Sequence, residues 1–209
     1  MLVDSTVIGF LDKVAGNDPV PGGGSIAALN GAIASSLTAM VAGLTIGKKG
    51  YEGRTELMER IQKTALDNKE EFIKDVDRDS EAYDQVFSCF KMPKLTADEK
   101  EARSAAIQAA TKYAAEVPLT VARRAYNLMD LIADVARLGN KNAVTDACVA
   151  MMSARSAVVG ALMNVRINLC SLKDRSYVLK MQNEVDALEQ RACAKEKELL
   201  NDINQELKL

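Results

Sequence analysis

Residues 19–47 read PVPGGGSIAALNGAIASSLTAMVAGLTIG and contain no charged side chain. Ser25, which follows three glycines, is a favourable N-cap residue and predicts a helix from there to about Ile46. Small side chains recur along this helix and let neighbouring backbones approach closely. They are those of Ala28, Gly31, Ser35, Ala39 and Ala42. We therefore expect a core helix against which the rest of the chain packs.

A membrane-spanning helix is the alternative interpretation of this segment, because its length suits a bilayer and Lys48 and Lys49 follow it. Polar residues dilute its apolar character, and few of its side chains are large. The polar residues are Asn30, Ser35, Ser36 and Thr38. We expect no membrane partner.

Helical periodicity continues on both sides of this segment. Thr96 and Glu99 have the spacing of a capping box, and Pro118 is expected to kink the chain or to restart the helix. The predicted helices span about residues 5–15, 25–46, 54–91, 96–116, 118–139, 142–170 and 174–209. No strand-length alternation of apolar and polar residues interrupts them. The sequence thus predicts an all-α fold, a single bundle of long antiparallel helices forming one domain over residues 1–209.

The composition excludes several classes of function. The chain has 209 residues, with 27 basic and 29 acidic side chains and a net charge of −2, so no basic tract indicates a nucleic-acid partner. No N-terminal leader pattern is visible, and we expect a cytoplasmic protein. The four cysteines are widely spaced and form no CxxC pair, which predicts neither a disulfide nor a metal site. Histidine is absent, so the usual neutral-pH base and most catalytic zinc sites are excluded.

Two features point to a ligand site without identifying the ligand. Gly22, Gly23 and Gly24 precede Ser25, and exposed backbone N–H groups at the start of a helix attract anions or electron-rich rings. Asp79 falls on the apolar stripe of the helix predicted at 54–91, where an unpaired carboxylate is costly and its pKa tends to rise. An interhelical salt bridge and a poised acid or base both remain open for Asp79.

The helix predicted at 142–170 carries only three charged residues. At 100° per residue one polar strip runs along it, with Arg155 and Arg166 on the opposite side. The strip consists of Asp146, Ala150, Ser153, Ala157, Gly160, Asn164 and Asn168. It is either a close helix contact or the floor of a pocket that recognises a heterocycle.

These segments together resemble the formiminotetrahydrofolate cyclodeaminase/methenyltetrahydrofolate cyclohydrolase family. The similar motifs span nearly the whole chain in the order of the family: PVPGGGSIAALNGAIASSL, MVAGLTIGKKGYE, DRDSEAY with Asp79, KMPKLTADEKEAR, AEVPL, GNKNAVTD ending at Asp146, and NVRINL. The resemblance implies an all-helical homodimer whose active site lies in a groove at the dimer interface. It also implies a folate substrate and no metal or nucleotide cofactor.

By position in the motifs, the resemblance assigns proton transfer to Asp79 and Asp146. It places Gly22, Gly23, Gly24 and Ser25 along the pocket. Asn140, Asn164 and Asn168 are expected to bind the pterin or the one-carbon unit, and Lys48 and Lys49 the glutamate tail. A carboxylate with a raised pKa can take the N10 proton during ring closure and protonate the departing ammonia.

Three functions follow from this resemblance. The favoured one is a cyclodeaminase that forms 5,10-methenyltetrahydrofolate with loss of ammonia, because the segment after Met92 is similar to that of the enzymes fused to a formiminotransferase. The alternatives are a cyclohydrolase that opens the methenyl ring with water to give 10-formyltetrahydrofolate, and a helical dimer that binds folate without chemistry.

Overall fold

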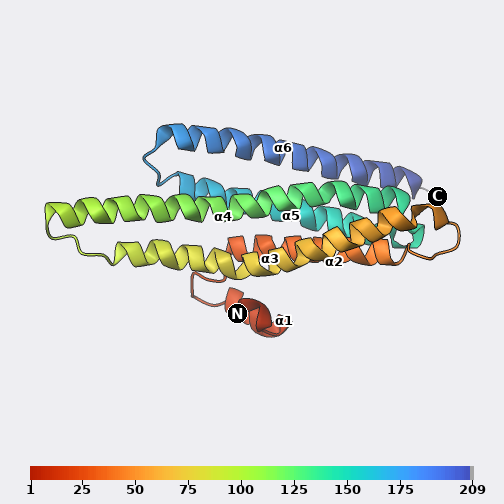
Figure 1. Ribbon diagram of the computed structural model, residues 1–209, viewed down its shortest axis with the longest axis horizontal. Coiled ribbons are helices and arrows are strands. Elements are labelled where there is room, and N and C mark those ends of the chain that lie inside the picture. Colours follow the sequence, from red (N-terminus) through yellow and green to blue (C-terminus); the bar gives the residue numbers. More distant parts are fainter. Residues whose placement is uncertain (208–209) are drawn as a thin grey trace.

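The computed structural model describes residues 1–207, which form long helices joined by short turns (Figure 1). This part of the chain contains six α-helices and no strand, which confirms the predicted all-α class. The α-helices are α1 (Val7–Val14), α2 (Gly23–Gly43), α3 (Thr55–Phe90), α4 (Ala97–Leu138), α5 (Val144–Leu169) and α6 (Arg175–Glu206). Three short 3₁₀ helices precede α1, α3 and α5: η1 (Leu2–Asp4), η2 (Glu52–Arg54) and η3 (Lys141–Ala143). The predicted end of the last helix, at 208–209, lies outside the described residues.

Successive long helices run antiparallel, as predicted. Gly43, at the end of α2, lies beside Gln62 near the start of α3, whereas Gly24 at the start of α2 lies beside Asp79. α2 packs against α3 and α5, and α4 packs against α3 and α5. In Figure 1, α3 and α4 lie in front, α2 and α5 lie behind them, and α6 runs along one edge of the bundle.

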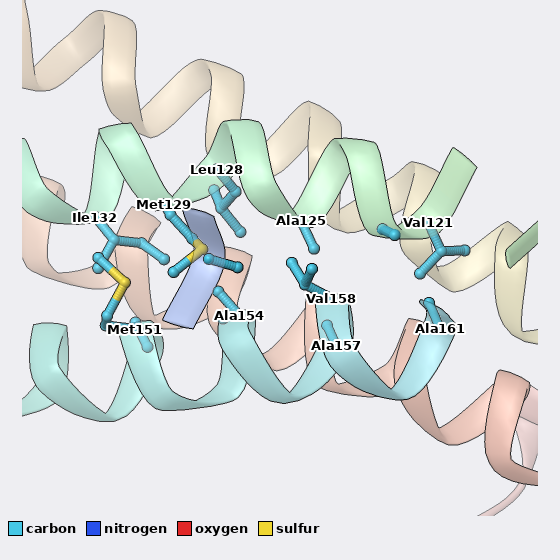
Figure 2. Packing of buried hydrophobic residues seen from close by; sticks show 14 of the residues in the cluster. Val121, Ala125, Leu128, Met129, Ile132, Met151, Ala154, Ala157, Val158 and Ala161 are labelled. Atoms are coloured by element: carbon cyan, nitrogen blue, oxygen red, sulfur yellow. The ribbon is translucent and has the colours of Figure 1, made fainter. Parts of the chain in front are cut away.

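The centre of the bundle is the contact between α4 and α5 (Figure 2). Large side chains of α4, including Leu128 and Ile132, point toward small residues of α5, including Ala154 and Ala157, and all four are fully buried. Close packing of such a core removes apolar surface from water and stabilises the bundle. α2, predicted from its small side chains to be a core helix, is also largely buried and packs against α3, α4 and α5.

Pro118 does not restart the helix. α4 runs without interruption from Ala97 to Leu138 with Pro118 inside it, so the prediction of two separate helices was wrong. Proline lacks the N–H that would bond to the carbonyl of Ala114, one turn earlier. That carbonyl accepts a hydrogen bond from Asn168 Nδ2 at 3.0 Å, so a neighbouring helix supplies the missing donor.

The predicted helix caps had different outcomes. The capping box of Thr96 and Glu99 is confirmed, with both reciprocal hydrogen bonds present. The N-cap role of Ser25 was wrong, because α2 begins two residues earlier and Gly22 is its N-cap. Ser25 is fully buried in the first turn, where its hydroxyl group contacts α3 instead of the start of its own helix.

Two stretches, Gly23–Gly43 and Lys141–Leu169, are long and apolar enough to cross a bilayer when length and composition alone are considered. Both belong to the helix core of the bundle. α2 packs against three long helices, and α5 contacts α2, α4 and α6. Their apolar character is thus partly explained by burial within the protein.

Candidate functional site

The start of α2 meets the middle of α3 at Gly24 and Asp79. A β-carbon at position 24 would collide with the Asp79 carboxylate, so only glycine permits this approach. Ser25 Oγ lies 2.9 Å from the carbonyl oxygen of Val76 and 3.2 Å from Asp79 Oδ2, and its proton can be donated to either acceptor. The carboxylate therefore lies at the positive end of the α2 dipole, where a negative charge is favoured.

Opposing effects set the pKa of Asp79. Burial is the largest effect and raises the pKa above the ordinary value for aspartate. Hydrogen bonds from the side chain and the backbone of Ser25 act in the opposite direction, because they stabilise the ionised form. The net shift is upward, so Asp79 holds a proton more readily than an exposed aspartate, as a proton-transfer group requires.

Asp75, one helical turn before Asp79, serves a different purpose. Its carboxylate is buried and forms ion pairs with Arg78 of α3 and Arg124 of α4. A buried carboxylate between two guanidinium groups ties the two helices together and leaves little capacity for another partner. Asp75 thus forms the interhelical salt bridge that the sequence left open for Asp79, whereas no ion pair of Asp79 is present among residues 1–207.

Two asparagines of α5 complete this end of the bundle. A β-carbon at Gly23 would lie 3.4 Å from Asn164 Nδ2, which places the Asn164 amide against the glycine turn. Asn164 Nδ2 donates to the carbonyl of Gly160 at 2.9 Å, and Asn168 Nδ2 donates to the carbonyls of Asn164 and Ala114. Because the amide nitrogens bond to backbone carbonyls, the amide oxygens are the groups left to accept hydrogen bonds from a ligand.

We call these residues the Asp79 cluster: Gly22, Gly23, Gly24, Ser25, Asp79, Asn164 and Asn168. The structure brings together Gly23, Gly24, Ser25, Asp79 and Asn164 from three helices. Gly22 is the N-cap residue next to them, and Asn168 lies one turn along α5 from Asn164. The sequence did not predict that Pro118 helps to position Asn168, by leaving the Ala114 carbonyl without its helical donor. The proline itself was a visible signal, but only the structure shows which side chain replaces its missing N–H.

The remaining predicted residues lie at the opposite end of α2 and α5. Lys48 Nζ donates to Asn140 Oδ1 at 2.8 Å, and Asn140 also receives the N–H of Asn142 and caps η3. Lys49 is exposed, and Asp146 is half-buried in the first turn of α5. We call Lys48, Lys49, Asn140 and Asp146 the Asn140 cluster.

The two clusters are far apart within one chain. About 27 Å of helix axis separates Asp146 from Asn164, at a rise of about 1.5 Å per residue. A single folate-binding pocket cannot include both carboxylates of the same chain. The structure therefore does not bring Asp146 to Asp79 within one protomer.

An apolar cavity of about 670 Å³ lies between the N-terminal segment, α2 and α3, and is lined by residues including Phe10, Leu29 and Ile73. None of the predicted site residues lines it. Within residues 1–207, no group of three or more aspartate, glutamate or cysteine side chains is arranged to hold a metal ion.

Comparisons with known proteins agree with this geometry. The family model described as formiminotransferase-cyclodeaminase matches residues 6–187. A methenyltetrahydrofolate cyclohydrolase from Methylorubrum extorquens is 38% identical over 189 residues, which is 90% of each chain. A formimidoyltransferase-cyclodeaminase from Mus musculus is 30% identical over 191 residues, and the match covers 91% of this chain but only 35% of that relative.

A solved structure is also similar along nearly its whole length. It is that of a formiminotetrahydrofolate cyclodeaminase from Thermotoga maritima, with a TM-score of 0.82 and 30% sequence identity. The match covers 97% of this chain and 99% of that one. The same helical bundle therefore occurs in a protein of closely similar size.

Proposed function

The chain belongs to the formiminotransferase-cyclodeaminase family, and on that basis we propose that it is a folate one-carbon enzyme that converts 5-formiminotetrahydrofolate to 5,10-methenyltetrahydrofolate and ammonia. The observation that carries the proposal is the Asp79 carboxylate, held against Gly24 and Ser25 with a raised pKa. Family relatives named for folate chemistry supply the substrate class.

Proton transfer by Asp79 accounts for both halves of this reaction. N10 attacks the formimino carbon, and the ionised carboxylate takes the N10 proton as the new C–N bond forms. The formimino group enters in its protonated amidinium form, so attack by N10 leaves an amino group on the ring carbon. The protonated carboxyl group then gives the N10 proton to this amino nitrogen, its bond to carbon breaks, ammonia leaves, and the methenyl product keeps the positive charge. Burial raises the pKa of the Asp79 carboxyl group, and the hydrogen bonds from Ser25 oppose that shift.

Cyclohydrolase activity is a second candidate, favoured by the 38% identity to the Methylorubrum extorquens enzyme over 90% of both chains. In that reaction Asp79 takes a proton from the water that attacks the methenyl carbon. The same proton passes to N5 as the C–N5 bond breaks, and the remaining hydroxyl proton is released to solvent as the formyl C=O bond forms. In both reactions Asp79 transfers the proton and no metal or nucleotide is needed, and both agree with the cytoplasmic location expected from the sequence.

We propose further that the enzyme is a homodimer formed through α2 and α5. Exposed apolar side chains follow one another along these two neighbouring helices. They are Ile33, Met40 and Leu44 of α2, and Val149, Met152, Met163 and Ile167 of α5. Single exposed apolar residues are ordinary, but a continuous apolar face on two adjacent helices is typical of a protein interface.

Two-fold symmetry supports an active site shared between subunits. A symmetry axis across the middle of α2 and α5 places the start of these helices in one subunit near their end in the other. The Asn140 cluster of the partner subunit then lies close to the Asp79 cluster. In this arrangement, Asp146 and the two lysines act on the substrate held by the other chain.

An absorbance assay tests the activity. Incubation with 5-formiminotetrahydrofolate is expected to produce the near-ultraviolet absorbance of the methenyl compound, and Asp79→Asn is expected to abolish it. Starting from 5,10-methenyltetrahydrofolate, loss of this absorbance measures cyclohydrolase activity. Binding of folate with no change of absorbance in either direction would refute both enzyme assignments and favour a non-catalytic binding protein.

A further inference from the structure

The last three turns of α3 carry exposed aromatic side chains beside the Asp79 cluster. α2 begins at Gly23, opposite Asp79, while α3 continues to Phe90. The α3–α4 pair therefore projects beyond the start of α2 and the end of α5, as the yellow and light-green ribbons of Figure 1 show. This projection leaves part of the α3 surface without a neighbouring helix from α2 or α5.

Tyr83 and Phe87 lie on the same face of α3 as Asp79, one and two turns further along. Their side chains are 42% and 48% exposed. The chain has only nine aromatic residues and no tryptophan, so two neighbouring exposed rings are unusual for it. Their rings are nearly parallel, with an interplanar angle of 10° and centroids 6.3 Å apart. Parallel exposed rings are suited to contact with a flat aromatic group.

Lys91 extends this row by one more turn. Its Nζ lies 4.5 Å from the centroid of the Phe87 ring, and no ion pair joins it to a carboxylate among residues 1–207. A proton-transfer carboxylate, two aromatic rings and a cation thus follow one another at four-residue steps along the end of α3 and its C-cap residue. We call Tyr83, Phe87 and Lys91 the α3 ledge.

We propose that the α3 ledge is the subsite for the aryl-glutamate part of the substrate, with the p-aminobenzoyl ring on Tyr83 and Phe87 and the glutamate carboxylates near Lys91. The inference rests on the proposed folate activity. A reduced folate carries its reactive bridge, its benzoyl ring and its carboxylates in the same order in which the helix presents Asp79, the two rings and Lys91. The charge and shape of the ledge therefore complement that half of the substrate.

The ledge gives the glutamate tail a cation from the same chain as Asp79. Lys48, which the sequence predicted for this role, lies beyond the far end of α2, about 30 Å from Gly24. It already donates to Asn140 in the described structure. Lys91 needs no second subunit to reach a substrate held at Asp79.

Fragment binding tests the inference directly. Titration calorimetry with N-(4-aminobenzoyl)-L-glutamate is expected to show binding that Phe87→Ala weakens about tenfold, because an aromatic contact is lost. Lys91→Gln is expected to weaken it several-fold and to reduce its dependence on salt. Binding of 6-methyltetrahydropterin, which lacks the aryl-glutamate, should be the same in both variants and the wild type.

Two exposed residues away from the ledge provide matched controls. Leu179→Ala on α6 removes an exposed apolar side chain, and Lys63→Gln removes an exposed charge from α3 itself. Neither change should affect fragment binding. Equal binding by Phe87→Ala and the wild type, or equal losses in the control variants, would overturn the inference.

Kinetics and mass separate this inference from the proposals on which it rests. In an active enzyme, Phe87→Ala should raise KM about tenfold and leave kcat nearly unchanged, since the ring contacts a non-reacting part of the substrate. Turnover by the wild type with an unchanged KM in Phe87→Ala refutes the ledge alone. Absence of wild-type turnover refutes the enzyme assignment, while fragment binding still decides the ledge. A fall in molecular mass in Phe87→Ala would show that a second copy of the chain covers these rings and would also refute the ledge.

Discussion

Asp79 combines the chemical role proposed above with an environment that disfavours its charge. Its carboxylate is held where burial raises its pKa, and glycine and serine of the first turn of α2 surround it. If the Asp79 side chain served packing alone, an apolar side chain could take its place without loss of stability. Substitutions at Asp79 and its direct neighbours therefore test the function most directly.

Replacement of Asp79 by Asn is expected to lower kcat by about 10² to 10⁴-fold, the usual contribution of a general acid–base group. The folded protein should be at least as stable at pH 7. A carboxyl group with a raised folded-state pKa costs stability once the pH exceeds that pKa, and the amide removes this cost. Steady-state rates and thermal denaturation at pH 7 check both points. Asp84→Asn, an exposed change on the same helix, should keep full activity.

The pH dependence of turnover should report the same carboxylate. Because the ionised form of Asp79 starts the reaction, kcat/KM should fall as the pH decreases through its raised pKa, above the ordinary value near 3.8. Ser25→Ala removes a hydrogen bond that lowers this pKa, so the acidic limb should move to higher pH. Ser35→Ala alters a buried serine of α2 whose Oγ has no partner in the described structure. It should leave the pH profile unchanged, and a similar shift in both variants would contradict the assignment.

Sequence patterns predicted part of this site well. Asp79 on an apolar stripe required a special environment, and the structure supplies one at the predicted glycine turn. Asp146 shows the limit of the method, because it shares a helix face with Asn164 but lies about 27 Å away along the axis. Periodicity gives the direction in which a side chain points, whereas its position relative to other helices depends on tertiary packing.

At the scale of the helices, Pro118 links α4 to α5. The proline leaves the Ala114 carbonyl without its helical donor, and the Asn168 amide bonds to it. The expected break at residue 118 did not occur because a side chain of another helix satisfies this carbonyl. Local sequence rules describe what proline removes, but they cannot show what a distant residue restores. The helix boundaries that depend on local signals, such as the capping box of Thr96 and Glu99, were predicted correctly.

A double-mutant cycle measures this link. Asn168→Ala should cost about 1–3 kcal/mol of unfolding free energy, because it leaves the Ala114 carbonyl without a donor. In the Pro118→Ala background, the new N–H at position 118 can bond to that carbonyl, so the same change should cost about 1 kcal/mol less. Denaturant unfolding of the four proteins gives the coupling. Asn30→Ala, which loses only a bond to Ile26 in its own helix, should be additive with Pro118→Ala. If the effects of Asn168→Ala and Pro118→Ala on the unfolding free energy are additive, the Ala114 carbonyl does not depend on the Asn168 amide.

The whole molecule has two ends, and each carries part of the predicted site. One end holds the Asp79 cluster and the other holds the Asn140 cluster, with the exposed apolar face of α2 and α5 between them. An antiparallel pairing of two chains through that face would bring unlike ends together. A change that prevents the two chains from pairing should therefore also remove activity.

Met152→Glu should disrupt the proposed dimer, because it places charges on both sides of an apolar two-fold interface. Light scattering is expected to give twice the chain mass of 22.6 kDa for the wild type and a single chain mass for the variant. Activity should fall at least tenfold with the loss of the partner. Leu179→Glu, a change at an exposed apolar position on α6, should remain dimeric and active. An active monomer would contradict the shared site.

Mixing two inactive variants tests whether the carboxylates act across subunits. Asp79→Asn and Asp146→Asn homodimers should each be inactive. Random reassortment after mild denaturation should restore about a quarter of wild-type activity, since half of the dimers are mixed and each has one intact site. No recovery in mixtures whose subunits have demonstrably exchanged would show that Asp146 does not act in trans.

The contact between Gly24 and Asp79 also bears on how such a chain can diverge. A methyl group at position 24 would displace the carboxylate while leaving the helices and the apolar core intact. One small substitution would then turn an enzyme into a folded pseudoenzyme that retains its ligand-binding surface. Among related sequences, alanine at this position is therefore expected to mark members that have lost catalysis and serve as carriers or sensors of folate.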